Sequence, residues 1–138
     1  MSEKVDKFCS DLRDRLTAIE DRLNQAKESV EKASHDTHEA IEAKKAEIKT
    51  KADADKQKVK DAEAKAKNWV EAKVAAAEAD IEEWKTKREI HKLEKRADHA
   101  EDYAASAIIL AAAAVDEAEF AILDAVGARL LAEDAASA

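Results

Sequence analysis

Residues 103–131 read YAASAIILAAAAVDEAEFAILDAVGARLL. Placed on a helix, the large apolar side chains of this stretch occupy more than one face; they are Ile108, Ile109, Leu110, Val115, Phe120, Ile122, Leu123, Val126, Leu130 and Leu131. A helix that is apolar nearly all round is usually covered on several sides. We therefore expect this stretch to be the central helix of a bundle or an interface between subunits. Gly127 lies within it and indicates either the close approach of another helix or a local helix end.

The composition of the whole chain excludes most other fold classes. Its 138 residues include no proline and one glycine, so the turn residues that sandwiches, barrels and βαβ units need are missing. A single cysteine cannot form an internal disulfide framework. Alanine, with 33 residues, favours helix but removes little apolar area from water when it is buried. We predict an all-α chain with a small core, which favours association with copies of itself.

Two series of apolar and small residues advance in steps of three and four, as in the seam of a coiled coil. The first starts at Leu12 and is rich in leucine, whereas the second starts at Ile90 and consists mainly of alanine. Small residues in a seam let helix axes approach closely, so we predict that the two segments pack together antiparallel. We expect assembly to use the large residues of these segments and two tryptophans between them: Leu12, Leu16, Ile19, Leu23, Val30, Trp69, Trp84, Ile108, Val115, Ile122 and Leu130.

Without proline, the helix breaks must be placed from capping residues and phase. The polar stretch 34–38 suits a connection, and Asp36 and Thr86 each begin a capping-box pattern with a glutamate three residues later. The apolar phase also slips near residues 86–89. We predict one domain over residues 1–138, an elongated antiparallel bundle or hairpin with helices at about 3–33, 37–86 and 89–134.

The tract 49–58 contains no large apolar side chain that could be buried, so it is either a solvated charged helix or a disordered linker.

The net charge of −8 is unevenly distributed, because the last 38 residues carry eight acidic side chains and one basic side chain. This balance argues against nucleic acid as a partner and disfavours anionic membranes. The longest uncharged run, residues 103–115, is shorter than the ~20 residues that cross a bilayer. The first residues contain no apolar segment typical of a secretory signal, so we expect a cytoplasmic protein with Cys9 reduced.

Histidines beside carboxylates are the only candidates for a metal site. His35 and His38 lie near Glu39 and Glu42, and a similar cluster surrounds His91 and His99. Di-metal sites in bundles use Glu-x-x-His, and no histidine here has a glutamate three residues before it. We therefore interpret the histidines as surface or capping residues. The sequence also offers no nucleophile with a neighbouring base and no phosphate loop, so we expect neither catalysis nor a cofactor.

Residues 43–79 contain repeats such as Glu-Ala-Lys, Ala-Asp-Ala-Asp-Lys and Asp-Ala-Glu-Ala-Lys-Ala-Lys. This tract resembles the Ala/Lys/Glu-rich helices of late-embryogenesis-abundant and apolipoprotein-like bacterial stress proteins. The resemblance implies a stress-linked, non-enzymatic role. The leucine-rich seam and the apolar segment 103–131 depart from the pattern of hydrophilic desiccation proteins.

The sequence thus predicts a non-enzymatic helical scaffold or interaction protein that binds itself and, as a second option, another protein. One alternative is an amphipathic protein that binds a lipid or hydrophobic granule surface, which the scarcity of basic residues near the C-terminal end disfavours. The other alternative is a metal-binding bundle that uses the histidine and carboxylate clusters.

Overall fold

The structure, a computed structural model, describes residues 2–75 and 78–137. These residues form five helices and no strand, which confirms the prediction of an all-α chain. The helices are α1 (Glu3–Ala33), α2 (His38–Ala54), α3 (Lys56–Ala75), α4 (Glu78–Thr86) and α5 (Ile90–Ser137).

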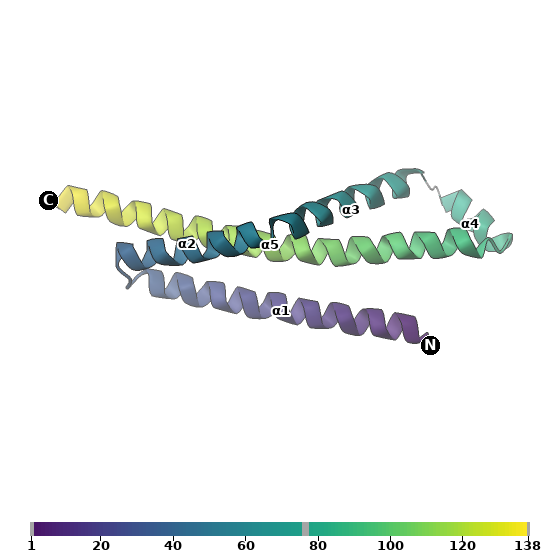
Figure 1. The fold of residues 1–138 in the computed structure, drawn as a ribbon, viewed down its shortest axis with the longest axis horizontal. Coiled ribbons are helices and arrows are strands. Elements are labelled where there is room, and N and C mark those ends of the chain that lie inside the picture. Colours follow the sequence, from purple (N-terminus) through teal and green to yellow (C-terminus); the bar gives the residue numbers. More distant parts are fainter. Residues whose placement is uncertain (1, 76–77, 138) are drawn as a thin grey trace.

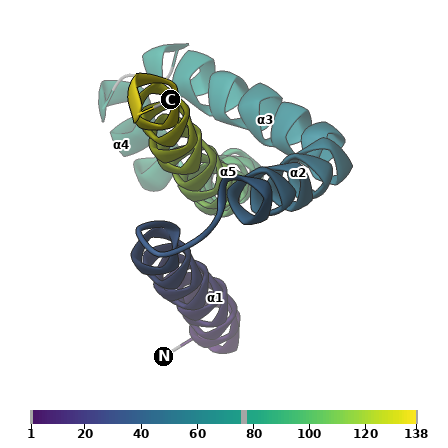
Figure 2. The ribbon, with the colours of Figure 1, turned by 90° about the vertical axis from the view of Figure 1, so that its left-hand side faces the viewer.

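Helix α5 is the centre of the bundle. It has 48 residues and contacts each of the other four helices. Figure 1 shows it extending along most of the molecule, and the end-on view of Figure 2 places α1 and α2 on different sides of it. The interpretation of the apolar stretch 103–131 as a central helix is therefore confirmed.

The direction of packing differs from the prediction in one respect. The segments 3–33 and 89–134 do pack together, but α1 and α5 run in the same direction, while α2 and α3 run antiparallel to both (Figure 1). The chain reverses after α1 and again after α4, and two reversals return α5 to the direction of α1. The antiparallel place beside α5 is taken by the middle segment of the chain.

The first reversal lies where the polar stretch 34–38 predicted it. Helix α1 ends at Ala33, and Thr37 is the N-cap of α2, with its hydroxyl accepting a 3.2 Å hydrogen bond from the amide of Ala40. The capping residue is thus Thr37 and not Asp36. The predicted first helix, residues 3–33, agrees with the structure.

The prediction of one helix over residues 37–86 is wrong. Helix α2 ends at Ala54 and α3 begins at Lys56, although the backbone hydrogen bonds from Asp55 to Lys51 and from Val59 to Asp55 continue across the break. The charged tract 49–58 is otherwise helical, and the chain bends there (Figure 1). Because this tract has no large apolar side chain, packing does not hold it straight. Residues 76 and 77, between α3 and α4, lie outside the described residues.

The second reversal is a left-handed turn at Arg88. Its φ is 53°, the amide of Arg88 donates to Lys85, and the amide of Glu89 donates to Trp84. This is the Schellman pattern that ends many helices, normally with glycine at the left-handed position. The turn predicted near residues 86–89 is confirmed, but Thr86 does not cap α5, since its hydroxyl donates to the carbonyl of Glu82 at 2.8 Å.

The core is small and lies where α1, α2 and α5 meet. It contains Ala33, Ile41, Ile48 and Leu123, with partly buried residues packed around it: Phe120, Val126 and Leu130. Gly127 is buried on the side of α5 that faces α2, and a Cβ atom there would lie 3.6 Å from Ile41. The glycine therefore marks a close approach of α2, and α5 continues past it.

Candidate functional site

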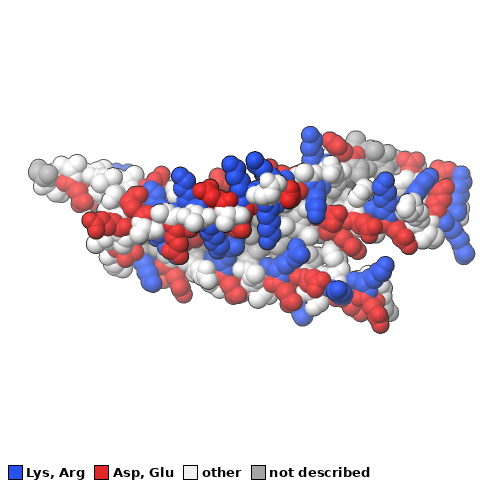
Figure 3. Space-filling view, viewed as in Figure 1, with Lys and Arg blue, Asp and Glu red and all other residues white. Residues whose placement is uncertain are grey.

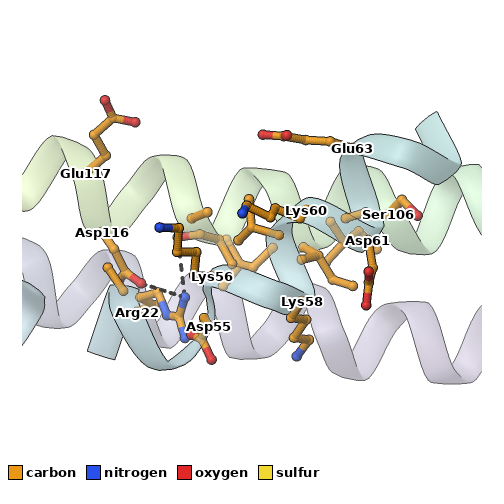
Figure 4. A pocket seen from close by; sticks show the side chains of 18 of the residues that line it. Arg22, Asp55, Lys56, Lys58, Lys60, Asp61, Glu63, Ser106, Asp116 and Glu117 are labelled. Atoms are coloured by element: carbon orange, nitrogen blue, oxygen red, sulfur yellow. Dashed lines mark hydrogen bonds and ion pairs between the residues drawn. The ribbon is translucent and has the colours of Figure 1, made fainter. Parts of the chain in front are cut away.

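A groove runs over α5 between α1 on one side and α2 and α3 on the other (Figure 4). Its volume is about 1220 Å³, and its apolar part includes Ile19, Ile48, Val59, Ile109 and Phe120. Charged residues, among them Lys56, Lys60 and Glu63, come from the same elements. The groove exists because α1 and the α2–α3 segment each pack on α5 more than on one another.

One ion pair joins two helices at this groove. The guanidinium of Arg22 on α1 lies 3.0 Å from the carboxylate of Asp116 on α5 and donates a 3.3 Å hydrogen bond to the carbonyl of Ala112. The Asp116 side chain is only 7% exposed, so the ion pair compensates a buried charge. Among the described lining residues there is neither histidine nor cysteine, and Ser106 is the one hydroxyl.

The histidines are not brought together with enough ligands for a metal. His35 lies in the α1–α2 connection, and His38 at the start of α2 is 3.5 Å from Glu42, whereas His91 and His99 lie on α5. Over residues 2–75 and 78–137, no group of three or more His, Cys, Asp or Glu side chains is arranged to hold a metal ion. The clusters seen in the sequence are therefore not assembled into a site.

The outer face of α1, which we define by Cys9, Leu16 and Leu23, is apolar and open to solvent. Leu16 is 54% exposed and Leu23 is 45% exposed, and Cys9 is an exposed free thiol. The alternate seam positions of α1 are turned toward the bundle and are partly or fully buried: Leu12, Ile19, Ala26 and Ala33. Because α1 packs mainly on α5, Leu16 and Leu23 of the second seam row remain exposed. Further along the same row, Val30 is partly buried.

The two tryptophans hold the middle helices against α5. Trp69 of α3 stacks on Tyr103 with ring centroids 5.9 Å apart, and the guanidinium of Arg96 lies over the same indole. The ammonium of Lys92 lies 5.9 Å from the ring of Trp84 in α4. Both indoles are partly buried, so they act as packing residues within one chain.

The other residues predicted to mediate assembly fall into two groups. Four are partly buried within the bundle: Val30, Ile108, Val115 and Leu130. Ile122 is 43% exposed and resembles Leu16 and Leu23 in facing solvent. The exposed residues are free to contact another molecule, whereas the partly buried ones mainly stabilise the fold.

Lys45 is a structural residue that the sequence did not single out. Its ammonium lies 2.6 Å from Asp124 and 3.2 Å from Glu42, and it sits 5.4 Å from the centre of the Phe120 ring. The hydrogen bond to Asp124 is the main cause that raises the pKa of Lys45 above its ordinary value of 10.5. Nothing in the local sequence indicates this contact, because Asp124 is 79 residues away.

The surface shows no large patch of one charge on the face seen in Figure 3, where basic and acidic side chains are interspersed. Among the described residues, no helix combines the length and apolarity needed to cross a bilayer. The chain matches no family model, and comparison with curated proteins and with solved structures finds no similar one.

Proposed function

We propose that this protein is a non-enzymatic helical scaffold that associates with copies of itself through the outer face of α1. The observation that carries the proposal is the exposure of Leu16 and Leu23 on a regular heptad helix. Burying a leucine side chain is favourable by about 1.5–3 kcal/mol. Leucines repeated every seven residues form the seam of helix pairs, so a second helix is the natural partner for this row.

The small hydrophobic core of the chain also supports the proposal. The buried core contains few large side chains, and much of the helix surface is charged. Small cores are marginal on their own, and association stabilises such folds by mass action. The stress-linked role implied by the compositional resemblance is compatible with a scaffold and remains a prediction.

Replacing Leu16 and Leu23 together with aspartate is expected to reduce the mass of the assembled protein to that of a single chain. Two buried carboxylates would cost more than the association can supply. The measurement is light scattering coupled to size-exclusion chromatography, with circular dichroism to confirm that the helices remain.

The matched control adds the same two charges one residue further along α1, as Thr17→Asp and Asn24→Asp, both at exposed positions. This control should assemble as the unmodified chain does. An unchanged mass in the Leu16→Asp/Leu23→Asp variant would rule out the outer face of α1 as the interface.

A lipid or granule surface is the competing partner for exposed apolar side chains. Co-sedimentation with liposomes or polyester granules separates the two functions, because a scaffold stays in the supernatant. Pelleting that is lost in the Leu16→Asp/Leu23→Asp variant would favour the surface-binding function instead.

A further inference from the structure

We infer that α1 pairs antiparallel with α1 of a second copy about a two-fold axis near Leu16. The inference rests on the proposed function and specifies its partner, its direction and its register. It is carried by the pattern of charges beside the outer face of α1.

The apolar row fits this axis. Cys9, Leu16 and Leu23 are seven residues apart, close to two helical turns, so they lie in one stripe. With the axis at Leu16, this side chain meets Leu16 of the second copy, and Leu23 meets Cys9 of the second copy. All three positions are exposed in the single chain.

The charged row beside it fits the same axis. Four charged residues also repeat every seven residues and alternate in sign: Asp6, Arg13, Glu20 and Lys27. The last three each lie four residues after a residue of the outer face, so the charged row runs beside the apolar one. In the antiparallel pair, Arg13 faces Glu20 of the second copy and Asp6 faces Lys27 of the second copy. The two-fold axis doubles both contacts, so all four charges of each chain face the opposite sign. A parallel pair would place the two charged rows on opposite sides of the interface.

These charges are available for a partner. All four are exposed, and none of them takes part in an ion pair within residues 2–75 and 78–137. The other flank of the leucines is formed by Leu12, Ile19 and Ala26, which are turned toward the bundle. Ser10, Thr17 and Asn24 lie beyond the charged row on its own side and are uncharged. The paired segment from Asp6 to Lys27 is about 33 Å long at ~1.5 Å per residue. An interface of this size is modest, so a covalent capture experiment is the sharpest test.

Leu23→Cys is the capture variant, because its new thiol would face Cys9 of the second copy. Under mild oxidation we expect a covalent dimer in which the tryptic peptide 8–13 is linked to the peptide 23–27. The thiols at 9 and 23 of one helix are about 21 Å apart at ~1.5 Å per residue, too far for an internal disulfide. In the unmodified dimer the two Cys9 thiols, one from each copy, are also about 21 Å apart, so we expect no disulfide between them.

The control is Glu28→Cys, an exposed position on the same helix that does not face the second copy. It should give no link between residues 9 and 28. Links from 9 to 9 and from 23 to 23 would overturn the inference in favour of a parallel pair. Association without any specific link would overturn the register but leave the scaffold function standing, and a chain that is monomeric at every concentration would overturn both.

Charge reversal tests the row that carries the inference. Arg13→Glu places like charges opposite each other twice, so we expect the dissociation constant to rise roughly tenfold. The double variant Arg13→Glu/Glu20→Arg restores both contacts with their signs exchanged and should recover the original affinity. A double variant as weak as the single one would overturn the proposed facing of Arg13 and Glu20.

Discussion

At the scale of single residues, the structure shows which side chains are buried, exposed or ion-paired where the sequence pattern alone does not. The heptad spacing predicts the leucine seam of α1 as one unit, but Leu16 and Leu23 are exposed while Leu12 and Ile19 are turned toward the bundle. A heptad pattern shows that both rows are apolar and cannot show how many partners the helix has. The ion pairs of Arg22 with Asp116 and of Lys45 with Asp124 were also not predictable, because 94 and 79 residues separate the partners.

The left-handed turn at Arg88 gives a prediction at this scale. Replacing Arg88 with glycine should stabilise the fold by about 1 kcal/mol, because a side chain in the left-handed region costs about that amount. Urea denaturation of the variant and the unmodified chain measures the difference. Lys87→Gly is the control and should not stabilise, since its position is not left-handed. Equal destabilisation by both glycines would contradict the turn.

Gly127 gives a second prediction. Glycine inside a helix costs roughly 0.5–1 kcal/mol relative to alanine. A Cβ atom at this position would meet Ile41 and Glu42 at 3.6 Å, which is ordinary contact. Gly127→Ala should therefore raise the free energy of unfolding by about that amount, whereas Gly127→Leu should lower it by about 1–3 kcal/mol through overpacking. A loss of stability on Gly127→Ala would mean that the backbones of α2 and α5 approach too closely at this point to admit a Cβ atom.

At the scale of elements, most helix bounds could be predicted from the sequence, but the relative directions of the helices could not. Periodicity and polar connections placed α1, the reversal near Thr37 and the start of α5 well. The break at Asp55 has no sequence signal of its own, because it arises where packing is weak. The parallel direction of α1 and α5 depends on the number of reversals between them, which the seams do not encode.

The contact between α2 and α5 predicts a dependence of stability on pH. The Lys45 side chain is 13% exposed, and its pKa in the folded chain is raised, chiefly by the hydrogen bond to Asp124. The stabilisation should therefore be fully present below the ordinary lysine pKa of 10.5 and be lost as pH rises through the higher folded value. Lys45→Gln should lower the melting temperature at neutral pH, and its difference from the unmodified chain should shrink in strong alkali.

The control for this prediction is Lys51→Gln, which changes an exposed lysine of the same helix. It should have little effect on the melting temperature at either pH. A Lys45→Gln difference that persists unchanged in strong alkali would mean that the side chain acts through packing on Phe120 and not through its charge.

At the scale of the whole molecule, the other four helices pack on one long helix, α5, and large apolar side chains such as Leu16 and Leu23 remain exposed to solvent. The candidate surface was partly predictable, since the leucines were identified from their spacing. Which of them would remain exposed depends on α1 having α5 as its main neighbour. The molecule is thus organised as a central helix with an outer helix that has one free face.

The mass of the unmodified chain in solution, measured by light scattering over a wide range of concentration, tests self-association most directly. We expect the mass to rise with concentration from the monomer value of 15.1 kDa toward twice that value. A mass that stays at 15.1 kDa at the highest concentration would contradict self-association.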